Sequence, residues 1–330
     1  TIDITQPEGQ DIIRKLAAKV DVLIENYKVG GLAKYGLDYS SLEKVNPKLV
    51  YCSITGFGQT GPYAQRPGYD FLIQGMAGLM SVTGEPDSQN GGGPTKVGVA
   101  VTDIFTGLYA ANAIQGALLE RHHSGMGQYI DLALLDVQAA VMANQASNYL
   151  IGGQIPGRLG NAHPNIVPYQ AFATLDSHVI VAVGNDQQFQ RFCKAIGEPK
   201  WADDQRYATN TARVNNRVTL CGQITKHLKQ QTSQYWLSKF EDHAVPCGPI
   251  NTIDQVFDDP QIQSRNMVLT MQDPRAGELK LVANPINYSR SQIEYHLAPP
   301  QLGNQTIEIL QEYLEYAETT VKVLESNDVI

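Results

Sequence analysis

The chain has 330 residues, of which 42% are hydrophobic and 18% are charged, a globular composition that excludes a largely disordered chain. Its 25 Lys and Arg against 33 Asp and Glu give a net charge of -8, which argues against a nucleic-acid partner because phosphate contacts need clustered basic residues. The length exceeds what one hydrophobic core usually organises, so we expect two domains, and no apolar run suggests a membrane partner.

The first half of the chain alternates short apolar runs with helical stretches, a pattern typical of a parallel sheet with crossover helices. Residues 1–5 look like the end of a strand and lack an initiator Met, so we expect part of the fold to lie upstream of Thr1. Apolar patterning predicts strands at 20–24, 49–54 and 129–134, and helices at 69–80, 104–121 and 137–149.

The composition changes at residues 152–157, a Gly- and Pro-rich stretch that we interpret as a hinge between domains. Beyond it, the pattern predicts a strand at 178–183, β-strands with turns over 267–287, and helices at 187–196, 211–229, 232–241 and 304–316.

Cysteine and histidine spacing argues against disulfides and metal sites. The four cysteines lie far apart without a CxxC pair, so we expect free thiols in a reducing compartment, consistent with a cytoplasmic protein. Cys247 lies in a constrained turn and is expected to be a packed thiol. His122 and His123 are adjacent and would point to different sides of a helix, and no HExxH motif exists, so we expect no metal.

A glycine motif follows the second predicted strand. Residues 56–61 read Gly-Phe-Gly-Gln-Thr-Gly and match the dinucleotide-binding pattern G-x-G-x-x-G. That motif needs a helix to begin inside it, yet Pro62 and Pro67 follow here. A glycine-rich turn near a ligand is therefore the better interpretation.

Asp103 is the carboxylate of most interest. It follows the apolar run 97–102 and directly precedes the helix predicted from residue 104. At a helix N-terminus the dipole would favour the ionised, nucleophilic form of the acid. An ordinary Asp N-cap explains the same position equally well, so sequence position alone leaves both interpretations open.

Together these segments resemble the class III CoA-transferases, the CaiB/BaiF type, and are most similar to the succinate–hydroxymethylglutarate branch of that family. The resemblance runs in order through nearly the whole chain, and the matching segments are residues 25–27, 36–37, 51–62, 66–70, 97–103, 125–131, 160–164, 166–172 and 245–249.

The resemblance implies an α/β fold with a large Rossmann-like CoA-binding domain over residues 1–150, a smaller α+β domain with linkers over 151–290, and a return to the large domain over 291–330. It implies an interlocked homodimer, and it implies that coenzyme A, as a substrate, is the only cofactor. The partners would be an acyl-CoA, with succinyl-CoA as the expected donor, and a small carboxylic or dicarboxylic acid.

The resemblance also implies roles for individual residues. Asp103 would be the nucleophile that carries CoA as an aspartyl-CoA thioester, a species that requires exclusion of water. Further CoA contacts are expected upstream of Thr1, and Thr5 stands where a Lys is frequent. The residues expected to bind CoA are Asn26, Tyr27, Lys28, Lys34, Tyr69 and Asp70, and those expected in a substrate loop are Gly160, Asn161 and His163.

Two alternatives come from other functional classes. An α-methylacyl-CoA racemase shares the fold, but its catalytic His would fall at Tyr69, and a phenol with a pKa near 10 is a poor base at neutral pH. A non-catalytic CoA-binding protein would bind CoA without forming a covalent aspartyl species.

Overall fold

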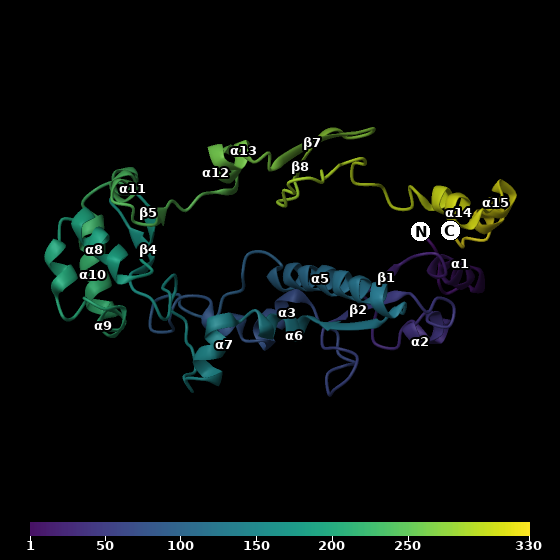
Figure 1. Ribbon diagram of the computed structural model, residues 1–330, viewed down its shortest axis with the longest axis horizontal. Helices are drawn as coiled ribbons and strands as arrows, with labels where there is room; N and C mark the ends of the chain where they lie inside the picture. Colours follow the sequence, from purple (N-terminus) through teal and green to yellow (C-terminus); the bar gives the residue numbers. More distant parts are fainter. The chain divides into compact units, whose positions relative to one another are not determined.

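The computed structural model describes residues 1–330 and separates into two compact units, Thr1–Arg158 with Pro300–Ile330, and Leu159–Pro299 (Figure 1). The elements of the first unit are α1 (Pro7–Ala17), β1 (Val22–Glu25), the 3₁₀ helix η1 (Ala33–Tyr35), α2 (Tyr39–Leu42), β2 (Val50–Thr55), α3 (Asp70–Met76), α4 (Leu79–Val82), α5 (Val101–Ser124), β3 (Tyr129–Ala133), α6 (Leu134–Ala140), α7 (Ala143–Leu150), α14 (Thr306–Leu314) and α15 (Glu318–Ser326). Those of the second unit are β4 (Tyr169–Ala173), β5 (His178–Ala182), α8 (Asp186–Ala195), η2 (Pro199–Asp203), α9 (Asn210–Asn215), α10 (Arg217–Leu228), α11 (Ser233–Asp242), β6 (Cys247–Gly248), α12 (Ile253–Asp258), α13 (Pro260–Ser264), β7 (Val268–Asp273) and β8 (Gly277–Val282).

A parallel sheet forms the centre of the first unit, in the order β1-β2-β3. Its middle strand β2 is buried from Val50 to Ser53, as expected for a parallel strand covered on both faces. Helix α5 packs against β2 and β3, and Figure 1 shows it running alongside β2. The expected α/β class with a parallel sheet and crossover helices is thus confirmed.

Several element boundaries differ from the sequence-based expectation. Residues 1–5 contain a turn at Ile4 and Thr5 instead of a strand end, and the Asp3 carboxylate accepts hydrogen bonds there from the backbone and hydroxyl of Thr5. The helix expected over 69–80 is split into α3 and α4 by Gly78, which has a left-handed φ of 87°. The helix expected over 137–149 is divided into α6 and α7, with Ala143 at φ 46°.

The second unit has an antiparallel sheet, in the order β4-β5-β6, packed on helices α8, α10 and α11. Its core includes stacked Phe192, Phe240 and Trp236. The single helix expected over 211–229 is two helices, α9 and α10, separated at Asn216, whose amide donates to the carbonyls of Arg206 and Ala212. The β-strands with turns expected over 267–287 are present as the β7–β8 hairpin.

The two ends of the first unit's sequence pack together. Ile12 of α1 shares a buried cluster with Leu310 of α14 and Leu324 of α15, a helix that the sequence pattern did not predict. No helix of the chain combines the length and apolar character needed to cross a membrane.

Candidate active site

Two glycines position the candidate site at the carboxyl end of β2. A methyl group on Gly56 would lie 2.5 Å from the Cα atom of Gly68, so only glycine permits the two backbones to cross there. No helix begins within residues 56–61, and the next one, α3, begins only at Asp70. The glycine motif therefore serves a close backbone crossing, and it places Tyr69 and Asp70 beside the end of β2.

Four of the residues expected to bind CoA line one cavity of about 180 Å³: Asn26, Tyr27, Lys28 and Tyr69. The segment after β1 is held against β2 because the Asn26 amide donates to the carbonyl oxygen of Ile54 at 2.6 Å. Tyr69 is 76% exposed and Tyr27 is 54% exposed, so both residues are accessible to a ligand. The structure thus brings together residues more than forty positions apart.

Arg66 also lines this cavity, and the sequence interpretation did not select it as a site residue. Its guanidinium carbon lies 4.6 Å from the ring centroid of Tyr63 and 5.4 Å from that of Phe57. A stacked guanidinium is pre-organised and suits phosphate recognition. The sequence signal that could have identified Arg66 was its place in the 66–70 segment, three residues before Tyr69.

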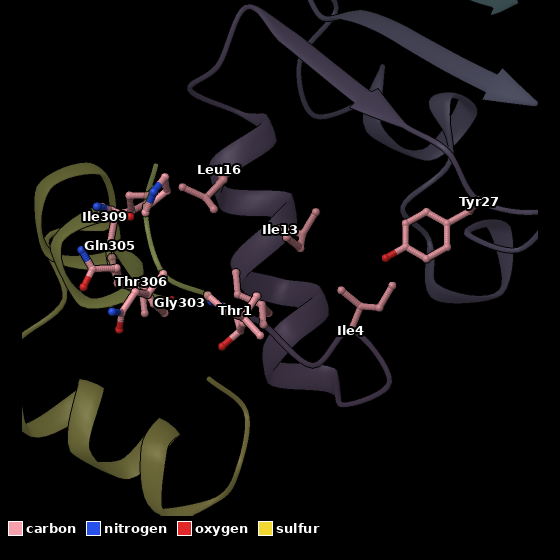
Figure 2. A pocket seen from close by; sticks show the side chains of 15 residues that line it. Thr1, Ile4, Ile13, Leu16, Tyr27, Gly303, Gln305, Thr306 and Ile309 are labelled. Atoms are coloured by element: carbon pink, nitrogen blue, oxygen red, sulfur yellow. Dashed lines mark hydrogen bonds between the residues drawn. The ribbon is translucent and has the colours of Figure 1, made fainter. Parts of the chain in front are cut away.

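Lys34 and Asp70 do not line this cavity. The Lys34 ammonium lies 4.5 Å from the ring centroid of Tyr35. Tyr27 additionally faces a separate cavity of about 730 Å³ between α1 and α14, where Figure 2 shows its ring directed toward Ile13 and Ile4. That larger cavity is not lined by Asp103, so volume alone does not identify the reacting site.

Asp103 lies in the first turn of α5 and is exposed. The helix begins at Val101 with Ala100 as its N-cap, so the N-cap interpretation of Asp103 was wrong. Desolvation by burial, and secondly the negative charge of Asp70, raise the pKa of the Asp103 carboxyl. These effects oppose the helix dipole and make the carboxylate more basic, which favours nucleophilic attack.

Asp70 is turned toward the beginning of α5. One of its carboxylate oxygens accepts a hydrogen bond from the backbone N–H of Thr102 at 3.2 Å, one residue before Asp103. The amide of Gln74, which is fully buried, donates to both oxygens of Asp70 at 2.6 and 3.1 Å. No sequence motif indicated this role for Gln74, since it depends on the contact between Asp70 and the beginning of α5.

The expected substrate-loop residues Gly160, Asn161 and His163 lie in the second unit. Arg217 fixes their loop by donating to the carbonyl oxygens of His163 at 2.8 Å and Pro164 at 2.7 Å. Desolvation, and secondly the charge of Arg217, lower the pKa of His163. Since its Nδ1 accepts from the backbone N–H of Asn165, the neutral ring carries its proton on Nε2.

All four cysteines are free thiols. Burial raises the pKa of Cys193 to about 12 and that of Cys221 to about 11, and it also raises the pKa of Cys247. Thiols with such pKa values are poor nucleophiles at neutral pH.

Known proteins match nearly the whole chain. The model of CoA-transferase family III matches residues 1–306. The chain is 51% identical to a succinate–glutarate CoA-transferase of Agrobacterium fabrum, over 96% of this chain and 78% of that protein. It is 41% identical to the human succinyl-CoA:glutarate CoA-transferase, over 100% of this chain and 74% of that one. A crystal structure of a CaiB/BaiF family protein from Brucella suis superposes with a TM-score of 0.80 at 48% identity, covering 95% of this chain and 80% of that chain.

The chain therefore belongs to CoA-transferase family III. It is a CoA-transferase enzyme, as the resemblance implied.

Proposed function

We propose that this enzyme transfers CoA from succinyl-CoA to glutarate, with Asp103 as the nucleophile. The observation that carries the proposal is the identity, along nearly the whole chain, with two relatives named for succinate or succinyl-CoA together with glutarate. The exposed Asp103 at the start of α5, with its raised pKa, supports its role as the attacking carboxylate.

Every intermediate of the proposed cycle is an activated acyl compound, either an anhydride or a thioester. The Asp103 carboxylate attacks the thioester carbonyl of succinyl-CoA, the C–S bond breaks, and a mixed anhydride and CoA thiolate form. The thiolate attacks the aspartyl carbonyl, so that succinate leaves and an aspartyl-CoA thioester remains. Glutarate then attacks that thioester, and the returning thiolate forms glutaryl-CoA and restores the Asp103 carboxylate. The cycle uses no group other than CoA, which is a substrate.

The cavity lined by Asn26, Tyr27, Lys28 and Tyr69 is the proposed CoA contact in the first unit. Its volume of about 180 Å³ suits one part of CoA, since whole drug-sized ligands occupy about 300–1,000 Å³. Lys28 and Arg66 supply positive charge for the phosphates, and Lys34 remains a further proposed contact. Asp70 lies beside this cavity, where its contacts favour support of Asp103 over direct CoA binding.

Gly160, Asn161 and His163 form the proposed acceptor loop. A neutral imidazole with its proton on Nε2 offers one hydrogen-bond donor to a carboxylate. The carbonyl contacts of Arg217 support a fixed loop conformation, which lowers the entropy lost on binding.

We also propose a homodimer in the cytoplasm, with residues 1–150 and 291–330 in the CoA-binding domain. Exposed Ile104, Leu108 and Leu119 follow one face of α5, which is consistent with a protein partner there. Sedimentation of the purified enzyme tests the dimer.

The function is tested by incubating the enzyme with succinyl-CoA and a panel of dicarboxylic acids, with product analysis by mass spectrometry. Glutaryl-CoA and succinate in equal amounts are expected. If a different acyl-CoA forms instead, the acid from which it derives is the acceptor in place of glutarate. Exchange of the α-proton of a 2-methylacyl-CoA without transfer would instead indicate a racemase, and CoA binding without either activity would indicate a binding protein.

A further inference from the structure

A connected set of buried polar side chains lies beneath the first turn of α5. Thr102 is fully buried, and its hydroxyl donates to the side-chain oxygen of Gln138 on α6 at 2.7 Å. Gln74 on α3 is also fully buried and is joined to Thr102 through the carboxylate of Asp70. Buried polar groups that are fully paired define one local arrangement, since any other arrangement would leave some of them unsatisfied.

Gln74 has two separate tasks in this set. Its side-chain oxygen accepts a hydrogen bond from the backbone N–H of Val97 at 2.9 Å, which fixes the segment that leads into α5. Its amide nitrogen donates to both oxygens of Asp70, which in turn accepts from Thr102. The Gln74 side chain therefore holds both the segment that precedes Asp103 and the carboxylate of Asp70.

We propose that Gln74 is a positioning residue of the transferase, which fixes the Asp70 carboxylate against the first turn of α5 and thereby places the Asp103 carboxylate for attack on the thioester. This inference rests on the proposed nucleophilic role of Asp103. A misplacement of about 1 Å at a reacting group can cost about 100-fold in rate, so a buried amide that touches no substrate can still control turnover.

The proposal makes a prediction about charge as well as geometry. Asp70 is the charged neighbour that raises the pKa of Asp103, and no charged group of α6, β2 or β3 contributes to that shift. Gln74→Met has similar volume but no donor or acceptor, so it releases Asp70 and weakens its field at Asp103. Gln74→Glu keeps an acceptor for Val97, and since two carboxyl groups this close share one proton, its protonated oxygen can still donate to Asp70 without a change in net charge. Gln74→Met should therefore lower the pKa of Asp103, whereas Gln74→Glu should leave it nearly unchanged.

The test measures kcat, KM for succinyl-CoA and the pH profile of kcat/KM for both variants of the whole enzyme. Gln74→Met is expected to lower kcat about 100-fold with little change in KM, and to move the acid limb to lower pH. Gln74→Glu is expected to retain most of kcat, with an acid limb close to that of the wild type, because it keeps both contacts and the net charge. Gln187→Met, at an exposed glutamine of α8, is the matched control and should behave as the wild type.

A second readout separates this inference from the proposed function. Hydroxylamine captures an aspartyl thioester as a hydroxamate, which mass spectrometry of peptides can locate. If the wild-type enzyme gives no adduct at Asp103, the nucleophile assignment fails and this inference fails with it. If the adduct forms in the wild type, and Gln74→Met forms it at the wild-type rate with an unshifted acid limb, only the role of Gln74 is overturned. A lower kcat with unshifted acid limbs in both variants would also overturn it, since that result indicates a general loss of structure.

Discussion

Gly56 and Gly68 cross so closely that a Cβ atom on Gly56 would lie 2.5 Å from the Cα atom of Gly68. This contact joins the end of β2 to the residue before Tyr69, and so positions the proposed CoA cavity and the start of α3.

Gly56→Ala is therefore expected to damage both stability and activity. The methyl group meets the backbone of Gly68, and relief requires the two segments to separate, at a cost of about 3 kcal/mol in the free energy of unfolding. Denaturant unfolding measures this change. Gly222→Ala in α10 is the control, because a Cβ there meets open space, and it should stabilise the helix by up to about 1 kcal/mol. Equal stability of Gly56→Ala and the wild type would contradict the crossing.

Asp103→Ala is expected to bind succinyl-CoA but to lose transfer by about 1,000-fold or more, because removal of a nucleophile leaves only binding contributions to catalysis. Calorimetry measures the binding and product analysis the transfer. Asp136→Ala offers a matched control, since Asp136 is likewise an exposed acid in the first turn of a helix. Near-normal transfer by Asp103→Ala would remove this residue from the mechanism.

The pH dependence of kcat/KM follows from the raised pKa of Asp103. Attack requires the carboxylate form, so activity should fall as the pH drops through that pKa, at a higher pH than for an ordinary aspartate. Asp70→Asn removes a negative neighbour, and the acid limb should therefore move to lower pH. Profiles of kcat/KM against pH for the wild type and Asp70→Asn check the direction of this shift. A shift of the acid limb to higher pH would show that Asp70 does not act through its charge.

His163→Ala is expected to raise KM for the acceptor about 10-fold while leaving KM for succinyl-CoA almost unchanged, because one hydrogen bond to a charged carboxylate is lost. His163→Gln retains a donor near the position of Nε2 and should restore part of the affinity. Steady-state kinetics with several dicarboxylates provides the measurement, with His178→Ala at the exposed first residue of β5 as the control. An unchanged order of acceptor preference would exclude His163 from the acceptor site.

Local patterns predicted much of the fold and part of the site. Runs of apolar residues located β1, β2 and β3, because a covered parallel strand must be hydrophobic over consecutive positions. The same patterns missed the break at Gly78, where a single residue in a left-handed conformation ends α3 before a continuous helical pattern would. They also placed the start of α5 three residues too late, since Val101 and Thr102 continue an apolar run that does not distinguish strand from helix.

The sequence by itself determined the α/β class, the family and the identity of Asp103 as the acid to test, because these depend on apolar periodicity and on motifs whose residues are adjacent in the chain. Only the tertiary structure decided which groups surround that acid. Asp70 reaches Thr102 across 32 positions, and Gln74 reaches Val97 across 23, through hydrogen bonds that exist only once α3 and α5 are packed. Arg66 likewise joined the proposed CoA cavity only because Gly56 and Gly68 allow two backbones to meet. Periodicity shows which face of an element is buried. The charged and hydrogen-bonding groups that surround a site depend on which elements pack together, and that is decided by the tertiary structure.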